Sequence, residues 1–137
     1  MAKNTLTVDA TTENLSLVTA FIDKGLEEVM CPMKVQMQMD IAVEELFVNI
    51  SNYAYGSRVG KATIELDILD EPKRAVITFI DEGVPYDPLA KKDPDITLSA
   101  EERAIGGLGI FMVKKSMDDM TYEYTDGKNI LKIVKKF

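Results

Sequence analysis

The segment Val43–Gly56, "VEELFVNISNYAYG", places an acid and an amide four residues apart, at Glu45 and Asn49. Residues four apart on a helix lie on the same face, so both side chains would point toward the same neighbour. An amide oxygen suits Mg²⁺, which takes few protein ligands and leaves its other positions to waters and phosphates. A carboxylate one turn earlier could orient or deprotonate a water or a hydroxyl. The alternative interpretation is a polar patch whose groups are satisfied by neighbouring backbone.

A second candidate is Asp81, which ends the apolar run "AVITFID" and precedes Gly83 by two residues. A carboxylate at the end of a buried strand could accept a hydrogen bond from an amino group of a ligand. The alternative is an aspartate that only starts the turn after the strand.

Glycines open directly into a helix in "GGLGIFMVKK", at Gly106, Gly107 and Gly109, with Leu108 between them. The first N–H groups of a helix are unpaired, and together with the helix dipole they favour phosphate groups. Glycine also allows the backbone to approach a ligand closely. The motif matches neither the Walker pattern nor the dinucleotide fingerprint. Taken alone, it is better interpreted as a glycine-rich turn with nothing bound.

Two helices are predicted in the first half of the chain, and the second must carry Glu45. Asn14 can cap a helix that continues to about Val29. Pro32 suits the first turn of the next helix, which runs from about Met33 to Tyr53. The stripe expected to be buried on this second helix consists of Val35, Met39, Ala42, Leu46, Ile50 and Tyr53.

Strands and one more helix account for most of the remainder. "NTLTVD" and "ATIELDIL" alternate, and in the latter Ile64, Leu66 and Ile68 should face inward. "AVITFID" is apolar on both faces, which predicts a central strand. A third helix should run from Leu108 to about Met117, followed by a hairpin that turns at "DG".

This order predicts an α+β fold, a two-layer sandwich of a mixed, mostly antiparallel sheet and about three helices. We expect residues 1–137 to form a single domain, since this length suits one core. The irregular segment at about residues 86–105 is long for a compact domain, which predicts a lid over a functional site.

Composition excludes several classes of function. The net charge of −7 disfavours direct binding to nucleic acid, and no apolar run approaches the length of a membrane span. The absence of histidine removes catalytic triads and histidine-based zinc sites. The single cysteine and the lack of an apolar leader at the start of the sequence favour a cytoplasmic location.

Taken together and in this order, the motifs resemble the GHKL superfamily of ATP-binding proteins, which has the Bergerat, or histidine-kinase-like ATPase, fold. "EELFVNISNYAY" is similar to the N box, "DEGVP" to the first glycine box and "GGLGI" to the second. Within that superfamily the chain most resembles the bacterial anti-sigma factor serine/threonine kinases. The resemblance extends from Leu6 to the C-terminus.

The resemblance implies roles for particular residues. Asn49 matches the Mg²⁺-binding asparagine, and Glu45 matches the acid taken as the general base. Asp81 matches the carboxylate that receives the adenine amino group, with Gly83 beside the base. Arg103 would lie near the terminal phosphate, although a solvated arginine is an equal alternative.

The phosphates would lie in the second glycine box, Gly106–Gly109, where Gly107 and Gly109 match the glycines that cradle them. Two residues depart from the wider superfamily. Pro85 replaces the second glycine of the first box, as is typical of the anti-sigma branch. Tyr53 stands where many members have histidine, so no role is transferred to it.

The function implied is transfer of the γ-phosphate of ATP, with Mg²⁺, to a small partner protein of the anti-anti-sigma type. The alternative is an ATP-binding module that sequesters a sigma factor or another partner without phosphoryl transfer. The resemblance also suggests a homodimer.

Overall fold

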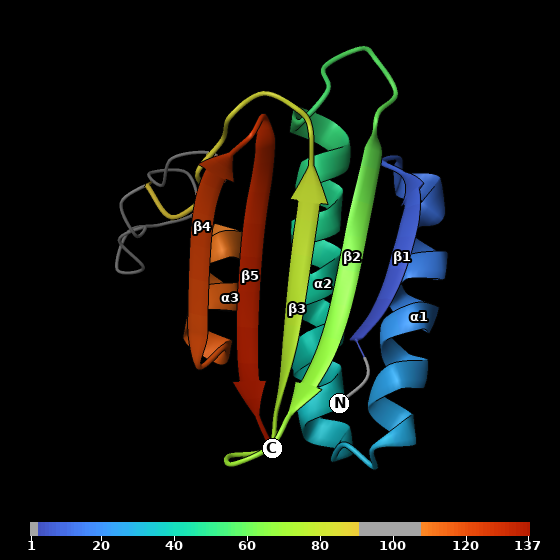
Figure 1. Cartoon of the computed structure of the whole chain (residues 1–137), viewed down its shortest axis with the longest axis vertical. Coiled ribbons are helices and arrows are strands. Elements are labelled where there is room, and N and C mark those ends of the chain that lie inside the picture. Colours follow the sequence, from blue (N-terminus) through green and yellow to red (C-terminus); the bar gives the residue numbers. More distant parts are fainter. Residues whose placement is uncertain (1–2, 91–107) are drawn as a thin grey trace.

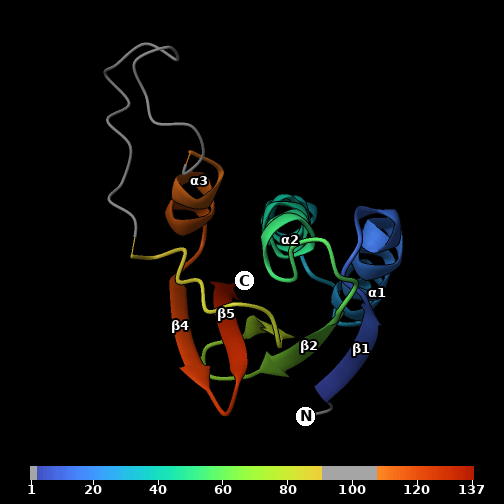
Figure 2. The same cartoon turned by 90° about the horizontal axis from the view of Figure 1, so that it is seen from above.

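The computed structural model describes residues 3–90 and 108–137, and within α3 it describes the side chains from Gly109 onward. A sheet forms one layer and three helices cover one of its faces (Figures 1 and 2). The elements are β1 (Lys3–Asp9), the short 3₁₀ helix η1 (Thr12–Asn14), α1 (Leu15–Glu28), α2 (Met33–Tyr53), β2 (Lys61–Leu69), β3 (Arg74–Asp81), α3 (Leu108–Ser116), β4 (Asp119–Thr125) and β5 (Lys128–Lys136).

The strands form one five-stranded sheet in the order β1-β2-β3-β5-β4. Every pairing between these strands is antiparallel, so the mixed component allowed for in the predicted sheet does not occur among them. The predicted α+β sandwich is confirmed. β3 is the middle strand, as its apolar residues on both faces predicted. A strand in this position is buried on its helix side and flanked on both edges, which makes its end a rigid place for a side chain.

The core lies between the sheet and the helices. In β2 the alternation predicted from the sequence is confirmed, because Ile64, Leu66 and Ile68 are buried. Ile64 pairs with Phe79 of β3, and Phe79 pairs in turn with Leu131 of β5. These three buried side chains therefore form a continuous row under α2.

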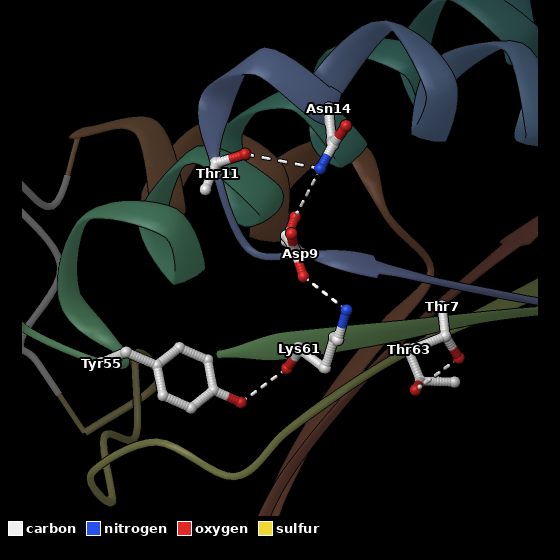
Figure 3. Close-up of polar contacts among 7 residues, drawn as sticks. All are labelled: Thr7, Asp9, Thr11, Asn14, Tyr55, Lys61 and Thr63. Carbon is white, nitrogen blue, oxygen red and sulfur yellow. Dashed lines mark hydrogen bonds and ion pairs between the residues drawn. The ribbon is translucent and has the colours of Figure 1, made fainter. Parts of the chain in front are cut away.

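One local prediction on the helices is confirmed only in part and another is wrong. Asn14 occupies the N-cap position of α1 as predicted, but its side chain makes no capping hydrogen bond. Its Nδ2 donates instead to the carbonyl of Asp9 at 3.0 Å and to Oγ1 of Thr11 at 3.4 Å (Figure 3). It thereby closes the turn between β1 and α1. Tyr53 does not belong to the buried stripe of α2, since it is 61% exposed at the last residue of that helix.

Within the two described ranges, no helix combines the length and the apolar character needed to span a membrane.

An acidic pair lies between α1 and α2. One carboxyl oxygen of Asp23 and one of Asp40 are buried, and neither has a hydrogen-bond donor among the described residues. Burial is the main cause that raises the pKa of Asp40 to about 7, and the neighbouring carboxyl of Asp23 and the charge of Glu27 raise it further. Gln36 donates to Glu27 at 3.1 Å, so that neighbour is already paired. Asp40 thus keeps its proton to a higher pH than an ordinary aspartate, and the charge that it gains on losing the proton is opposed by the charges of Asp23 and Glu27.

This pair predicts a stability that falls as the pH rises. An unfolded aspartate titrates near pH ~3.9, so between about pH 4 and pH 7 the folded state binds the extra proton and loses stability as the pH increases. Asp40→Asn should therefore raise the free energy of unfolding at pH 8 by roughly 1 kcal/mol, after allowance for solvent screening, and change it little at pH 4. Thermal unfolding at both pH values measures this. The exposed Asp70→Asn, which changes net charge equally, is the control, and an equal gain from both variants would contradict the account.

Candidate functional site

A cavity opens between the second half of α2, the end of β3 and the start of β5. Apolar side chains such as Leu46, Ile50 and Leu131 make up much of its wall. Its polar groups are few, and Asn49 and Asp81 are among them. A largely apolar cavity with a few fixed polar groups is typical of a small-molecule site. The chain therefore brings two of the residues singled out from the sequence to one place.

Asp81 is the buried acid of this cavity, with 6% of its surface exposed. Its Oδ1 accepts two hydrogen bonds of 2.9 Å, from the N–H of Gly83 and from Nδ2 of Asn129. Both of these bonds are to Oδ1, and no described residue donates to Oδ2, so that oxygen is available to another donor. Both interpretations made from the sequence thus describe the same residue, because Asp81 starts a turn and also lines the cavity.

Gly83 lies where the chain leaving β3 presses against the end of α2. A Cβ at this position would be 2.1 Å from the carbonyl oxygen of Ala54. That oxygen also accepts from the N–H of Val84 at 2.8 Å, so it cannot easily move aside. Only glycine fits this contact, which fixes the distance between α2 and the acid at the end of β3.

Tyr55, just beyond α2, secures the same corner. Its hydroxyl donates to the carbonyl of Lys61 at 2.5 Å and accepts from the N–H of Glu82 at 2.8 Å (Figure 3 shows the first of these). Burial is the main cause that raises the pKa of Tyr55 above its ordinary value, so the phenol keeps its proton and its donor role. The end of α2, the start of β2 and the exit of β3 are thereby joined through one side chain.

Glu45 and Asn49 lie on one face of α2, as predicted, and both are partly exposed. Asn49 lines the cavity. The carboxylate of Glu45 lies against the first turn of α3, since a Cβ on Gly109 would be 2.2 Å from its Oε1. The N-terminus of a helix attracts negative charge. Glu45 is therefore placed at the point where an anionic group of a ligand would also be favoured.

Several predicted site residues lie outside the described residues, namely Arg103, Gly106, Gly107 and residues 91–105 of the predicted lid. Leu108 is the first residue of α3, and Gly109 follows it. The roles predicted for these glycines and for Arg103 stay predictions.

Asn129, a polar residue that is only 4% exposed, was not predicted from the sequence. The register of the sheet pairs it directly with Asp81. The available signal was strand parity, since Asn129 is two residues from Leu131 and four from Ile133 and so shares the inward face of β5 with them. Parity alone does not say which residue of another strand lies opposite.

The cavity offers few groups that could bind a metal ion. The described ranges hold no group of three or more His, Cys, Asp or Glu side chains that could bind one. Asn49 offers a single amide oxygen at the cavity wall. That is compatible with Mg²⁺, whose remaining ligands in nucleotide sites come from phosphates and waters, and not with an ion held by protein groups alone.

The fold and the cavity define a class of protein. A family model of the histidine kinase-like ATPase domain matches residues 8–135, and the chain belongs to that family. The resemblance identified from the motifs is thereby confirmed.

The curated proteins that this chain resembles are named as a serine-protein kinase or as an anti-sigma factor. The chain is 31% identical over 97 residues to "Serine-protein kinase RsbW" of Bacillus cereus (strain G9842), a match that covers 68% of this chain and 59% of that protein. It is 30% identical over 98 residues to the protein of the same name from Listeria monocytogenes, covering 68% and 61%. The matches thus span about 60% of the length of these relatives. The chain is also 28% identical over 125 residues to "Anti-sigma F factor" of Caldanaerobacter subterraneus, covering 89% and 81%.

A solved structure has the same fold. It is titled "The crystal structure of the RsbU and RsbW domains of Rv1364c from Mycobacterium tuberculosis" and superimposes with a TM-score of 0.70. The match covers 98% of this chain and 32% of that one, at 14% sequence identity. At that identity the likeness concerns the fold.

The contact at Gly83 yields a prediction about stability. Gly83→Ala should lower the free energy of unfolding by about 1–3 kcal/mol, because the added methyl group would overlap a fixed carbonyl. Gly56→Ala is the matched control, since no atom lies within 4 Å of a Cβ there and only its φ of +61° opposes the change. Chemical denaturation measures both. A smaller loss for Gly83→Ala than for Gly56→Ala would contradict the described packing.

Proposed function

We propose that this chain binds Mg-ATP in the cavity and acts as a protein serine/threonine kinase on a small partner protein of the anti-anti-sigma type. The observation that carries the proposal is the buried Asp81 carboxylate, whose Oδ1 is held by two donors while Oδ2 is left to accept from a ligand. The adenine amino group is a donor of the kind that such an oxygen accepts. The family match supports the use of ATP.

The proposed roles are divided between the cavity, the second glycine box and the predicted lid. Asp81, in the cavity wall, would accept from adenine, with Gly83 beside the base. Asn49 would hold Mg²⁺, which supplies charge neutralisation for the phosphates when bound. The second glycine box, with Gly106, Gly107, Leu108 and Gly109, would bind the phosphates, and Arg103 would lie near the terminal one. The lid at residues 86–105 would close over the nucleotide.

Glu45 is the proposed general base. It would accept the proton of the attacking serine or threonine hydroxyl while the new oxygen–phosphorus bond forms and the bond to the leaving ADP breaks. Its place against Gly109, at the start of α3, supports this role because the phosphates are expected at the same turn. Phosphoryl transfer otherwise depends mainly on positioning and charge.

A second candidate function is an ATP-dependent binding module that sequesters a sigma factor without phosphoryl transfer. It is favoured by the match to the anti-sigma F factor, which covers more of both chains than the kinase matches do. Under either function we expect a cytoplasmic protein that forms a homodimer and binds neither membrane nor nucleic acid directly.

Nucleotide binding is tested first. Asn49→Ala should weaken the Mg²⁺-dependent part of ATP affinity most. Asp81→Asn should lower the preference for ATP over GTP by about 10–100-fold. The new side chain can direct its NH₂ group at the adenine amino group, and two donors then face each other. Calorimetry of both variants measures these effects, with the exposed Asn52→Ala on the same helix as control. Unchanged affinity in both variants would place the nucleotide elsewhere, and no binding by wild type at millimolar ATP would refute the proposal.

A substitution at Glu45 distinguishes the proposed kinase function from the proposed binding module. Glu45→Gln keeps size and hydrogen bonding but removes the base, so it should cut phosphate transfer by about 10²–10⁴-fold and leave ATP affinity nearly unchanged. Glu44→Gln is the control, because Glu44 is exposed and points about 100° away around the helix. Labelled ATP with candidate partner proteins gives the readout. Equal transfer by both variants and wild type would exclude Glu45 as the base, while ATP-dependent partner binding without transfer would favour the binding module.

A further inference from the structure

Asn129, the first inward-facing residue of β5, is buried and fully engaged. Its Nδ2 donates at 2.9 Å to Oδ1 of Asp81 and at 2.9 Å to the carbonyl of Val84, with a longer contact of 3.4 Å to the carbonyl of Gly83. Its Oδ1 accepts from the N–H of Tyr86 at 3.2 Å and from the hydroxyl of Tyr122. One carboxamide thus joins the acid at the end of β3, the segment that follows it, and β4.

The pattern of donors and acceptors allows only one orientation of this side chain. The Nδ2 side faces acceptors, namely the Asp81 carboxylate and the Val84 carbonyl, and the Oδ1 side faces donors. Turning the amide over would place donor against donor and acceptor against acceptor. Burial is the main cause that raises the pKa of Tyr122, so its hydroxyl stays protonated as a donor.

The orientation of the Asn129 amide determines the direction of the Asp81 carboxylate. With two donors on Oδ1, the carboxylate is fixed in rotation, and Oδ2 keeps one direction relative to the cavity. Without Asn129, only the N–H of Gly83 would hold Oδ1, and the carboxylate could turn about that single contact. Asn129 also lines the cavity itself.

The same carboxamide fastens both ends of the tripeptide Val84–Tyr86. It accepts from the N–H of Tyr86 and donates to the carbonyl of Val84, which spans Pro85. Val84, Tyr86 and Pro88 all line the cavity. The wall of the cavity next to Asp81 therefore depends on Asn129 as much as the acid does.

We propose that Asn129 is a positioning residue for adenine recognition, which orients the Asp81 carboxylate and fixes the Val84–Tyr86 wall beside it. This inference rests on the proposed function, since it assumes that adenine is the group that Asp81 receives. A purely structural asparagine would satisfy buried groups without favouring one base over another. The two roles differ in how a substitution changes the preference between bases.

The test compares ATP with inosine triphosphate, which carries a carbonyl oxygen where ATP has its amino group. Asn129→Asp keeps the size of the side chain and one acceptor oxygen but removes the donor to Asp81. It should lower ATP affinity by about 10–100-fold while affinity for inosine triphosphate changes less than about threefold. Asn4→Asp, the same substitution at an exposed position of β1, is the control and should leave both affinities unchanged. Calorimetry on the full chain gives both values.

Asn129→Ala is the second variant, in case two adjacent carboxylates prevent folding. It removes the donor to Asp81 without adding a charge, so the same fall in the ratio of ATP to inosine triphosphate affinity is expected from it. Equal losses for both nucleotides, or no loss of ATP affinity in a folded variant, would overturn the positioning role. If the wild type binds ATP but the variants keep the wild-type ratio of ATP to inosine triphosphate affinity, this inference alone is refuted. Wild type that does not bind ATP would refute the proposed function, and the adenine role of Asn129 with it.

Discussion

A buried carboxylate in a mostly apolar cavity is the constraint on which the rest of the site depends. Asp81 is 6% exposed, and a buried charge is tolerated only when hydrogen bonds replace the water that it loses. The N–H of Gly83 and Nδ2 of Asn129 supply two such bonds, and both act on the same oxygen. The carboxylate is thus stabilised and oriented by the same contacts, and its second oxygen is left for a donor from outside the protein.

Positioning these donors accounts for much of the architecture nearby. The antiparallel pairing of β3 with β5 brings Asn129 opposite Asp81 although 48 residues separate them. The close contact between Gly83 and Ala54 brings the end of α2 against the exit of β3. Since α2 also carries Asn49 and Glu45, the acid at the sheet and the polar face of the helix are held at a fixed separation. The first turn of α3 then reaches Glu45 through Gly109.

Sequence alone predicted the features that depend on local chemistry. The helix carrying Glu45 and Asn49, the alternation in β2 and the turn at Asp126–Gly127 all follow from spacing or from backbone preference, and both turn residues have positive φ. Features that depend on distant partners were missed. Asn14 was predicted as a helix cap, but its side chain bonds to Asp9, and helix periodicity could not reveal that Tyr53 lies exposed at the end of α2. Asn129 was missed because strand parity does not fix register.

The most direct test of the account is a titration of isotope-labelled protein with Mg-ATP, followed by nuclear magnetic resonance. The account predicts saturable shifts of the backbone amide of Gly83 and of the side-chain amides of Asn49 and Asn129. It also predicts little change at Thr7 and Thr63, which face each other across β1 and β2, away from the cavity (Figure 3). Shifts concentrated on the exposed face of α1, or none at millimolar ATP, would contradict the claim that Asp81 and its donors form a nucleotide site.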